Sequence, residues 1–266
     1  MSGKGLLDTY PLGRSLLFGL LAAAALAPGM ARSETVDSLL AKHIAARGGL
    51  AALQAVTSVT STGKLRPPGF DGDLAYSETI VRGGKVRVNL TLQGLTAVQS
   101  YDGTAGWQIQ PFGGRKDPEK LSDDDVKSLQ EEADFEGGLV DAKAKGNTLT
   151  YLGTEDVDGA PAHALRVQLK NGDTQTWYLD PDAFLAVRVV TRTVQRGTES
   201  VSVTDFGDYE KVAGVFFPFE QESGPKGSSQ RQRLTLSKIE VNAPVDAAQF
   251  VQPTAPQPTA PSAVQK

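Results

Sequence analysis

The sequence predicts a mainly β protein with a few helices, in which one antiparallel sheet makes up most of the fold. Three observations support this fold class. Apolar and polar residues alternate over many short segments, turn dipeptides such as Gly83-Gly84 and Asn171-Gly172 separate several of them, and helical periodicity is confined to two stretches. About eleven strands at such short spacing form a meander that either closes on itself or wraps around something.

The clearest strand is Lys85–Gln93, where Val86, Val88, Leu90 and Leu92 share one face and polar residues share the other. Strict alternation indicates a sheet with one buried and one solvated face, as in antiparallel sheets. The other predicted strands are Ala75–Arg82, Ala97–Tyr101, Gly106–Gln110, Thr148–Gly153, Ala162–Lys170, Thr174–Leu179, Leu185–Arg192, Glu199–Tyr209, Val215–Glu222 and Arg231–Val241.

Two segments have helical character. Thr35–Ala46 places Val36, Leu39 and Ile44 on one stripe before a pair of glycines ends the helix. Leu121–Glu132 begins with Ser122, a good N-cap, followed by three aspartates that suit the positive end of the helix dipole. Because these aspartates lack the spacing of a calcium loop, we interpret them as capping residues.

The first 33 residues have the composition of a secretion signal. Lys4 and Arg14 carry positive charge, and residues 15–27 form an uncharged apolar run. This run is shorter than the about 20 residues that a membrane-spanning helix needs, so we expect cleavage near residue 33 and a periplasmic protein. A retained membrane anchor is the alternative. The predicted organisation is a signal peptide (1–33), one β domain (34–250) and a disordered Pro/Ala-rich tail (251–266).

Composition removes several classes of function. The 266-residue chain has no cysteine, which excludes disulfides, thiol catalysis and lipid attachment through a signal-site cysteine, and its net charge of −4 argues against nucleic-acid binding. The two histidines, His43 and His163, lack the spacing of a metal site, and we find no nucleophile elbow, phosphate loop or dinucleotide fingerprint. We therefore expect no enzyme activity, no metal and no cofactor.

Apolar and aromatic residues are in surplus on one predicted sheet face. Only the N-terminal helix and the insert at 121–140 are available to cover it, so we expect an apolar cavity, and such cavities bind apolar ligands. A plainly packed core remains the alternative for these residues. The predicted cavity residues are Val88, Leu90, Leu92, Trp107, Ile109, Phe135, Leu165, Val167 and Trp177.

Four motifs carry a family resemblance that spans most of residues 35–250. These motifs resemble those of the bacterial outer-membrane lipoprotein carrier superfamily. They are the Asp-Gly hairpin with its tryptophan at 101–107, the Tyr-Leu-Asp hairpin at 177–187, the Asp-Tyr to Phe-Pro element at 206–218 and the Arg-Gly-Gly turn at 46–50. The resemblance implies an unclosed half-barrel of about eleven antiparallel strands, covered on its concave face by helices that act as a lid. Phe135 would belong to that lid.

The resemblance also implies a function. It implies a periplasmic carrier or sensor, acting as a monomer, that binds lipid or lipoprotein acyl chains and exchanges them with an inner-membrane transporter or an outer-membrane acceptor. In the family, a functional arginine on an early strand hydrogen-bonds the lid. Arg87 is the nearest counterpart, but the alternation puts it on the polar face, so we do not assign it that role.

Two alternatives to a lipid carrier remain open at this stage. One is an envelope interaction module whose core is filled. The other is an envelope hydrolase that uses a carboxylate pair, which would need two acids to converge in the cavity. The predicted inward face is nearly free of acidic residues, so the hydrolase is the weaker alternative.

Overall fold

The computed structural model describes residues 34–195 and 197–253. The expected signal peptide and most of the expected tail (254–266) lie outside these residues. Among the helices that are described, none has the length and apolar character required to cross a membrane.

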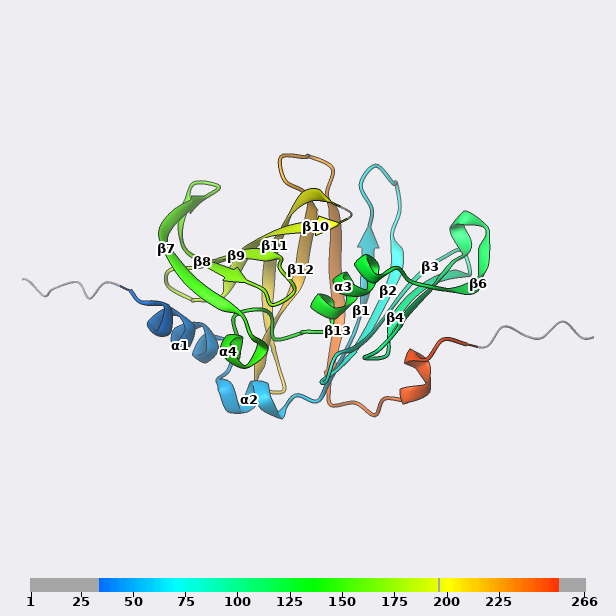
Figure 1. The fold of residues 1–266 in the computed structure, drawn as a ribbon, viewed down its shortest axis with the longest axis horizontal. Coiled ribbons are helices and arrows are strands. Elements are labelled where there is room, and N and C mark those ends of the chain that lie inside the picture. The colour runs from blue at the N-terminus through cyan, green and yellow to red at the C-terminus, as the bar shows by residue number, and fades with distance from the viewer. Residues whose placement is uncertain (1–33, 196, 254–266) are drawn as a thin grey trace, which may run out of the picture. The chain divides into compact units, whose positions relative to one another are not determined.

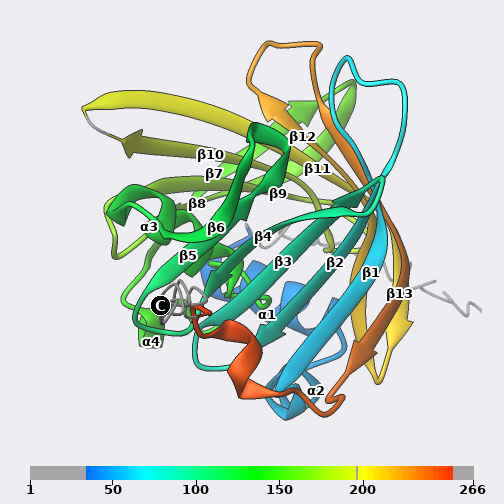
Figure 2. The same cartoon turned by 90° about the vertical axis from the view of Figure 1, so that its right-hand side faces the viewer.

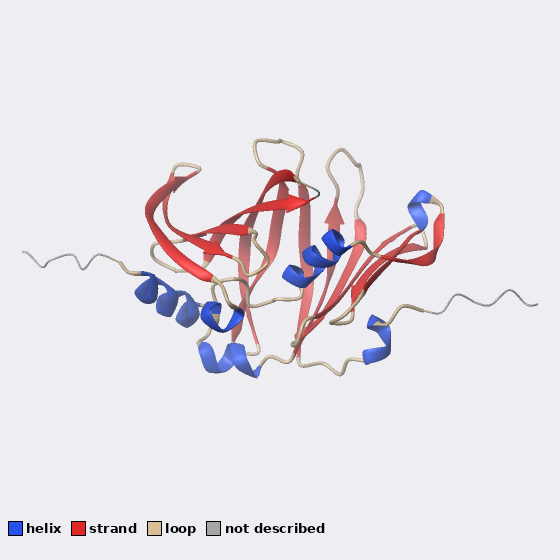
Figure 3. Cartoon of the chain, in the orientation of Figure 1, coloured by secondary structure: helices blue, strands red, loops and turns tan. Residues whose placement is uncertain are grey.

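Thirteen antiparallel strands form one sheet, in the order β6-β5-β4-β3-β2-β1-β13-β12-β11-β10-β9-β8-β7 (Figures 1 and 3). The two outermost strands, β6 and β7, do not pair with each other, so the sheet is an unclosed half-barrel, as predicted. The strands are β1 (Ser58–Arg66), β2 (Leu74–Val81), β3 (Lys85–Leu92), β4 (Leu95–Tyr101), β5 (Gly106–Gln110), β6 (Arg115–Lys120), β7 (Thr148–Val157), β8 (Ala160–Gln168), β9 (Thr174–Leu179), β10 (Ala186–Gln195), β11 (Thr198–Val212), β12 (Val215–Pro225) and β13 (Gln232–Val241).

The prediction of about eleven strands was too low by two, because β1 and β6 were not predicted as strands. In β1 the pairing with β13 shifts register between Thr62 and Gly63, which interrupts the alternation. β6 has the sequence RKDPEK, which is almost entirely charged and contains Pro118. Proline cannot donate a hydrogen bond to a neighbouring strand, so it is tolerated at the edge of a sheet, where β6 lies.

The topology explains why a helical segment crosses the concave side. The first and last strands, β1 and β13, pair at the centre of the sheet, and the chain proceeds outward to β6 in one half and returns inward from β7 in the other. The connection between these two free edges, residues 121–147, therefore spans the open side of the half-barrel (Figures 1 and 2). We call residues 121–147 the lid segment.

Within the described part of the chain, four α-helices accompany the sheet. The lid segment contains α3 (Asp123–Glu132) and α4 (Ala142–Lys145), and the N-terminal pair is α1 (Val36–Ala46) and α2 (Leu50–Ala55), which we call the floor helices. The capping prediction for α3 is confirmed, since the Ser122 side chain accepts a hydrogen bond from the Asp125 backbone amide.

A glycine pair between α1 and α2 brings the floor helices against the sheet. Gly48 has φ +117°, and a Cβ atom at this position would lie 2.1 Å from the carbonyl oxygen of Gly214 in the β11–β12 turn. Only glycine combines this backbone conformation with so close an approach.

The interior contains three clusters of buried apolar side chains. The first joins α2 to β1, β12 and β13 through Leu53, and the second joins α1 to β8–β10 through Leu39. The third joins α3 to β2–β4 through Leu129. The floor helices and α3 thus both pack on the concave face, against different parts of the sheet, while Leu139 and Val140 of the lid segment join the two clusters of the floor helices.

Candidate ligand-binding cavity

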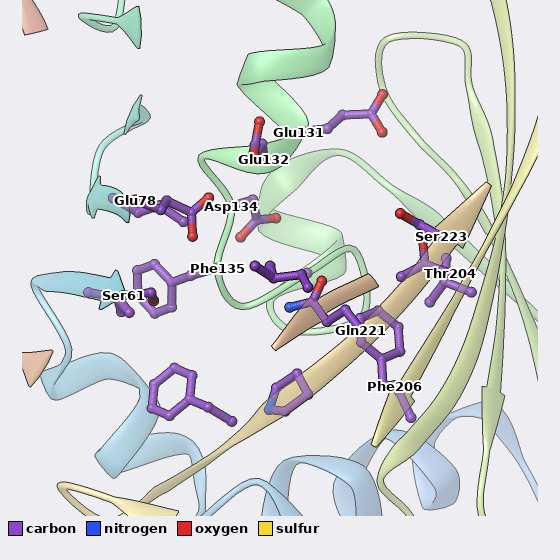
Figure 4. A pocket seen from close by; sticks show the side chains of 18 of the residues that line it. Ser61, Glu78, Glu131, Glu132, Asp134, Phe135, Thr204, Phe206, Gln221 and Ser223 are labelled. Atoms are coloured by element: carbon purple, nitrogen blue, oxygen red, sulfur yellow. The ribbon is translucent and has the colours of Figure 1, made fainter. Parts of the chain in front are cut away.

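A cavity of about 620 Å³ lies on the concave face between the sheet, the floor helices and the lid segment (Figure 4). Pockets of about 300–1,000 Å³ suit small organic ligands. The sheet contributes apolar and aromatic side chains to the wall, and the lid segment contributes Phe135. The apolar and aromatic residues around the cavity are Val59, Leu65, Tyr76, Ile80, Val88, Leu90, Phe135, Leu169, Trp177, Ala186, Val189, Phe206, Tyr209, Phe217, Leu234, Leu236 and Ile239.

The structure brings four of the nine sequence-predicted residues together around this cavity: Val88, Leu90, Phe135 and Trp177. Leu165 and Val167 do not border it, because both are fully buried in the core cluster that α1 shares with β8–β10. Leu92 continues the face of Val88 and Leu90 along β3 but lies beyond the cavity lining.

Trp107 and Ile109 lie on the opposite, outer face of the sheet, and not on the concave face where we expected them. The Trp107 indole N–H donates to the carbonyl oxygen of Phe250 at 2.6 Å, and the Arg87 guanidinium lies 5.4 Å from the Trp107 ring centre. Ile109 is two residues further along β5 and shares that face. The C-terminal 3₁₀ helix η2 (Ala247–Phe250) covers this region, which explains why an aromatic residue is buried on the outer side (Figure 2).

The expectation of an inward face nearly free of acids was wrong. Five carboxylic side chains line the cavity: Glu78 from β2, and Glu131, Glu132, Asp134 and Glu136 from the lid segment. Figure 4 shows the first four of them. A signal for Glu78 was present in the sequence, because it occupies the inward position between Tyr76 and Ile80. The cavity therefore combines an apolar wall with a polar, acidic lid.

Glu78 and Glu132 form a carboxyl pair between the sheet and the lid segment. Their carboxyls interact with each other, and the Tyr76 hydroxyl interacts with Glu78 as well. Burial raises the pKa of both carboxyls, and the neighbouring negative charge raises the pKa of Glu78 further. Two carboxyls in contact favour a shared proton, so this pair joins the lid to the sheet when it is protonated and repels when both groups are ionised.

Polar side chains attach α3 to both halves of the sheet. On one side the Gln130 amide donates to the Tyr101 hydroxyl at 2.9 Å. On the other side the Lys127 ammonium lies 2.6 Å from the carboxylate of Asp173, just before β9. Asn171 also donates to the Glu131 carboxylate at 2.7 Å. The helix is thus held across the cavity by hydrogen bonds and an ion pair, with little apolar contact besides Leu129 and Val126.

Two arginines hold the chain that follows α3. Arg82, at the end of β2, donates to the buried Glu136 carboxylate at 2.9 Å, and its guanidinium lies 5.0 Å from the Phe135 ring centre. Arg47, at the end of α1, is 7% exposed and donates to the carbonyl oxygens of Phe216 and Glu136 at 3.1 and 3.4 Å. Arg87, by contrast, donates to Gln249 on the outer face. Sequence reasoning placed Arg47 in the Arg-Gly-Gly turn but did not connect it with the lid segment, and Arg82 lies outside the four motifs.

No model of a known protein family matches the sequence, and no curated protein sequence matches it. The fold does match solved structures. One is the structure of a putative outer membrane lipoprotein-sorting protein domain from Vibrio parahaemolyticus, which is 11% identical to this chain. The two align with a TM-score of 0.55 over 81% of this chain and 97% of that one. A LolA superfamily protein from Nitrosomonas europaea is 14% identical with a TM-score of 0.56, covering 82% and 98%. The chain thus shares the fold of these two structures, which is the fold that the sequence motifs led us to expect.

Proposed function

We propose that this protein is an envelope carrier or sensor that binds a lipid or the acyl chains of a lipoprotein in the cavity. The observation that carries the proposal is a cavity of about 620 Å³ with an apolar wall, closed by a segment that is attached through polar contacts. Burying an acyl chain contributes about 0.8 kcal/mol per methylene group. Val88, Leu90, Phe135 and Trp177 are the side chains proposed to contact it.

The proposed site of action is the periplasm, which follows from the signal-like composition of residues 1–33. There, a carrier exchanges its cargo with an inner-membrane transporter or an outer-membrane acceptor, and a sensor responds to the cargo itself. Opening of the lid segment is the step that both roles share. The similarity of the fold to a lipoprotein-sorting domain supports this class of function.

We propose a binding role in preference to a catalytic one. Glu78 and Glu132 are an acid pair of the kind that a hydrolase would need, but their carboxyls interact directly with each other. Glycosidase carboxyls are at least about 5 Å apart, which leaves room for the substrate between them. The volume of the cavity also argues against an interaction module with a filled core.

Displacement of a fluorescent apolar dye by a fatty acid methyl ester tests the proposal, together with native mass spectrometry of the protein purified from the periplasm. We expect dye uptake, displacement by the ester and a co-purifying lipid. Leu90→Trp, which fills the cavity, should abolish uptake, whereas Thr91→Trp, on the outer face of the same strand, should not. Absence of ester binding together with a lipid-free native mass would refute the proposal.

A further inference from the structure

His43 is a fully buried imidazole in α1 that borders the cavity. Its side chain is 0% exposed. Its Nδ1 atom lies 2.8 Å from the carbonyl oxygen of Phe184, whereas its Nε2 atom has no hydrogen-bond partner. Across the described ranges 34–195 and 197–253, no other buried side-chain nitrogen or oxygen lacks a partner.

The contact with Phe184 determines which nitrogen carries the proton. A carbonyl oxygen can only accept, so Nδ1 must be the donor. Burial lowers the pKa of His43 to about 4, and the ring is therefore neutral near pH 7. In a neutral imidazole with its proton on Nδ1, Nε2 is a bare acceptor.

The surroundings of Phe184 hold the imidazole in this orientation. Phe184 has φ +56°, a left-handed conformation that costs an aromatic residue free energy, and the His163 ring stacks on it at 6.0 Å between ring centres. Lys42 lies 4.7 Å from the centre of the Phe184 ring. A strained residue packed in this way keeps its carbonyl oxygen directed at Nδ1.

None of the residues that the structure describes supplies a donor to Nε2. Trp177 stands edge-on to the imidazole, with 6.4 Å between ring centres, but its indole N–H donates to the side-chain oxygen of Gln175 at 2.8 Å. The Arg47 guanidinium is bonded to backbone oxygens of Phe216, Phe135 and Glu136. A buried acceptor without a partner is costly, and native structures usually satisfy such groups or use them.

We infer that His43 Nε2 is a recognition group for the ligand, and that the cavity prefers apolar molecules bearing a neutral hydrogen-bond donor, a hydroxyl or amide N–H, along the chain. Trp177 forms part of the cavity wall beside His43, and the Nε2 atom is buried, so the inferred hydrogen bond requires the Trp177 side chain to turn aside for the donor to reach Nε2. This inference rests on the proposed function, and it adds the chemical class of the ligand. A neutral hydrogen bond of this kind raises the binding affinity of the donor-bearing ligand about two- to tenfold over that of a ligand without the donor.

The test compares methyl tetradecanoate with its monohydroxylated derivatives, which carry the hydroxyl at successive positions along the chain. Affinities come from dye displacement, and the state of Nε2 comes from nitrogen-15 NMR of histidine-labelled protein, which is simple to assign because the chain has only two histidines. We expect at least one hydroxylated ester to bind about two- to tenfold more tightly than the parent and to shift the Nε2 resonance of His43.

Two substitutions test the roles of Nδ1 and Nε2 separately. His43→Asn can still donate to Phe184 from the Nδ1 position but has nothing at the Nε2 position, so it should bind both esters with equal affinity. His43→Gln carries an oxygen at the Nε2 position and should retain part of the preference. The NMR measurement on the unaltered protein needs neither variant to fold.

The outcomes distinguish the inference from the function on which it rests. Equal binding of all esters to the unaltered protein, with no change at Nε2, overturns the inference and leaves the carrier function intact. A preference that survives in a folded His43→Asn variant also overturns it. If no ester binds at all, the proposed function fails, and the inference fails with it.

Discussion

The floor helices and the lid segment both cover the concave face, but different forces hold them. Leu39 of α1 and Leu53 of α2 are fully buried in core clusters, and such side chains contribute about 1.5–3 kcal/mol each. In α3 the attachments across the cavity are mainly polar, through Lys127, Gln130 and Glu132. Asp173 and Tyr101, the partners of Lys127 and Gln130, are buried, and a hydrogen bond of this kind contributes about 0.5–1.5 kcal/mol net.

Because of this difference, the floor helices determine the stability of the domain, whereas the contacts of α3 control access to the cavity. Polar contacts can be exchanged for contacts with water, so lifting α3 costs far less free energy than detaching the floor helices, while Leu139 and Val140 keep the end of the lid segment packed in the core. The sheet and the floor can then remain folded while a ligand enters or leaves. Four predictions test this comparison, from the largest expected effect to the smallest.

Leu53→Ala should destabilise the whole domain by about 2–5 kcal/mol, because it leaves a void in the core that α2 shares with the sheet. Urea unfolding measures the effect. Leu50→Ala on the same helix is the control, since Leu50 is 41% exposed and its truncation should change the free energy of unfolding by less than about 0.5 kcal/mol. Equal effects would mean that the floor is not held by burial.

Glu136→Gln should loosen the lid segment by about 1–3 kcal/mol, because it removes the charge that Arg82 binds at 2.9 Å. Hydrogen exchange should accelerate over residues 121–147 and stay unchanged in β11–β13. The matched control is Glu119→Gln, whose partner Arg115 lies in an exposed pair and whose loss should have no measurable effect. Faster exchange in the lid and the central strands alike would contradict a lid that opens independently.

Glu78→Gln should stabilise the closed lid at neutral pH by about 1 kcal/mol, since the amide can donate to Glu132 without adding a second negative charge. The pKa of Glu78 is raised in the folded state, so the native protein holds this proton more tightly than the unfolded chain. The corresponding stability is present at low pH and is lost as pH rises from the ordinary value of 4.5 through the raised one.

Hydrogen exchange of the lid segment at several pH values measures this dependence. In the unaltered protein, exchange should accelerate as pH rises beyond the intrinsic effect of pH on exchange, and Glu78→Gln should reduce that excess. Glu240→Gln, in an exposed pair with Lys238, serves as the control. An unchanged excess in Glu78→Gln would exclude the carboxyl pair as a lid contact.

Ala213→Gly should stabilise the sheet by about 0.5–1 kcal/mol and leave the lid unaffected. Ala213 has φ +49° in the β11–β12 turn, a conformation that glycine adopts without steric cost. Thermal unfolding checks the prediction, and Ala75→Gly in β2 should have the opposite sign. A destabilised Ala213→Gly variant would show that the alanine methyl group packs usefully in the turn.

Local sequence pattern predicted most of the elements, because period two and helical capping are local properties. Ser122 and the alternation of β3 are examples. Pattern also put Trp107 and Ile109 correctly on one common face, but it does not say which face is concave. That depends on Phe250, more than a hundred residues away, whose carbonyl oxygen accepts from the indole.

The acidic character of the lid was harder to predict from sequence. Glu132 reads as a solvated position on a polar helix, and only the path of residues 121–147 between the two sheet edges brings it to Glu78. The same holds for Arg82 and Glu136, which are 54 positions apart in sequence. Contacts of this range follow from topology and not from local pattern.

Tying the lid segment to the sheet tests the central claim most directly. The chain has no cysteine, so Glu78→Cys combined with Glu132→Cys can be joined selectively by a short bismaleimide. The rate of dye release is then compared before and after crosslinking. A movable lid over an apolar cavity predicts that the crosslinked protein stays folded and releases dye at least tenfold more slowly, whereas equal release rates would contradict it.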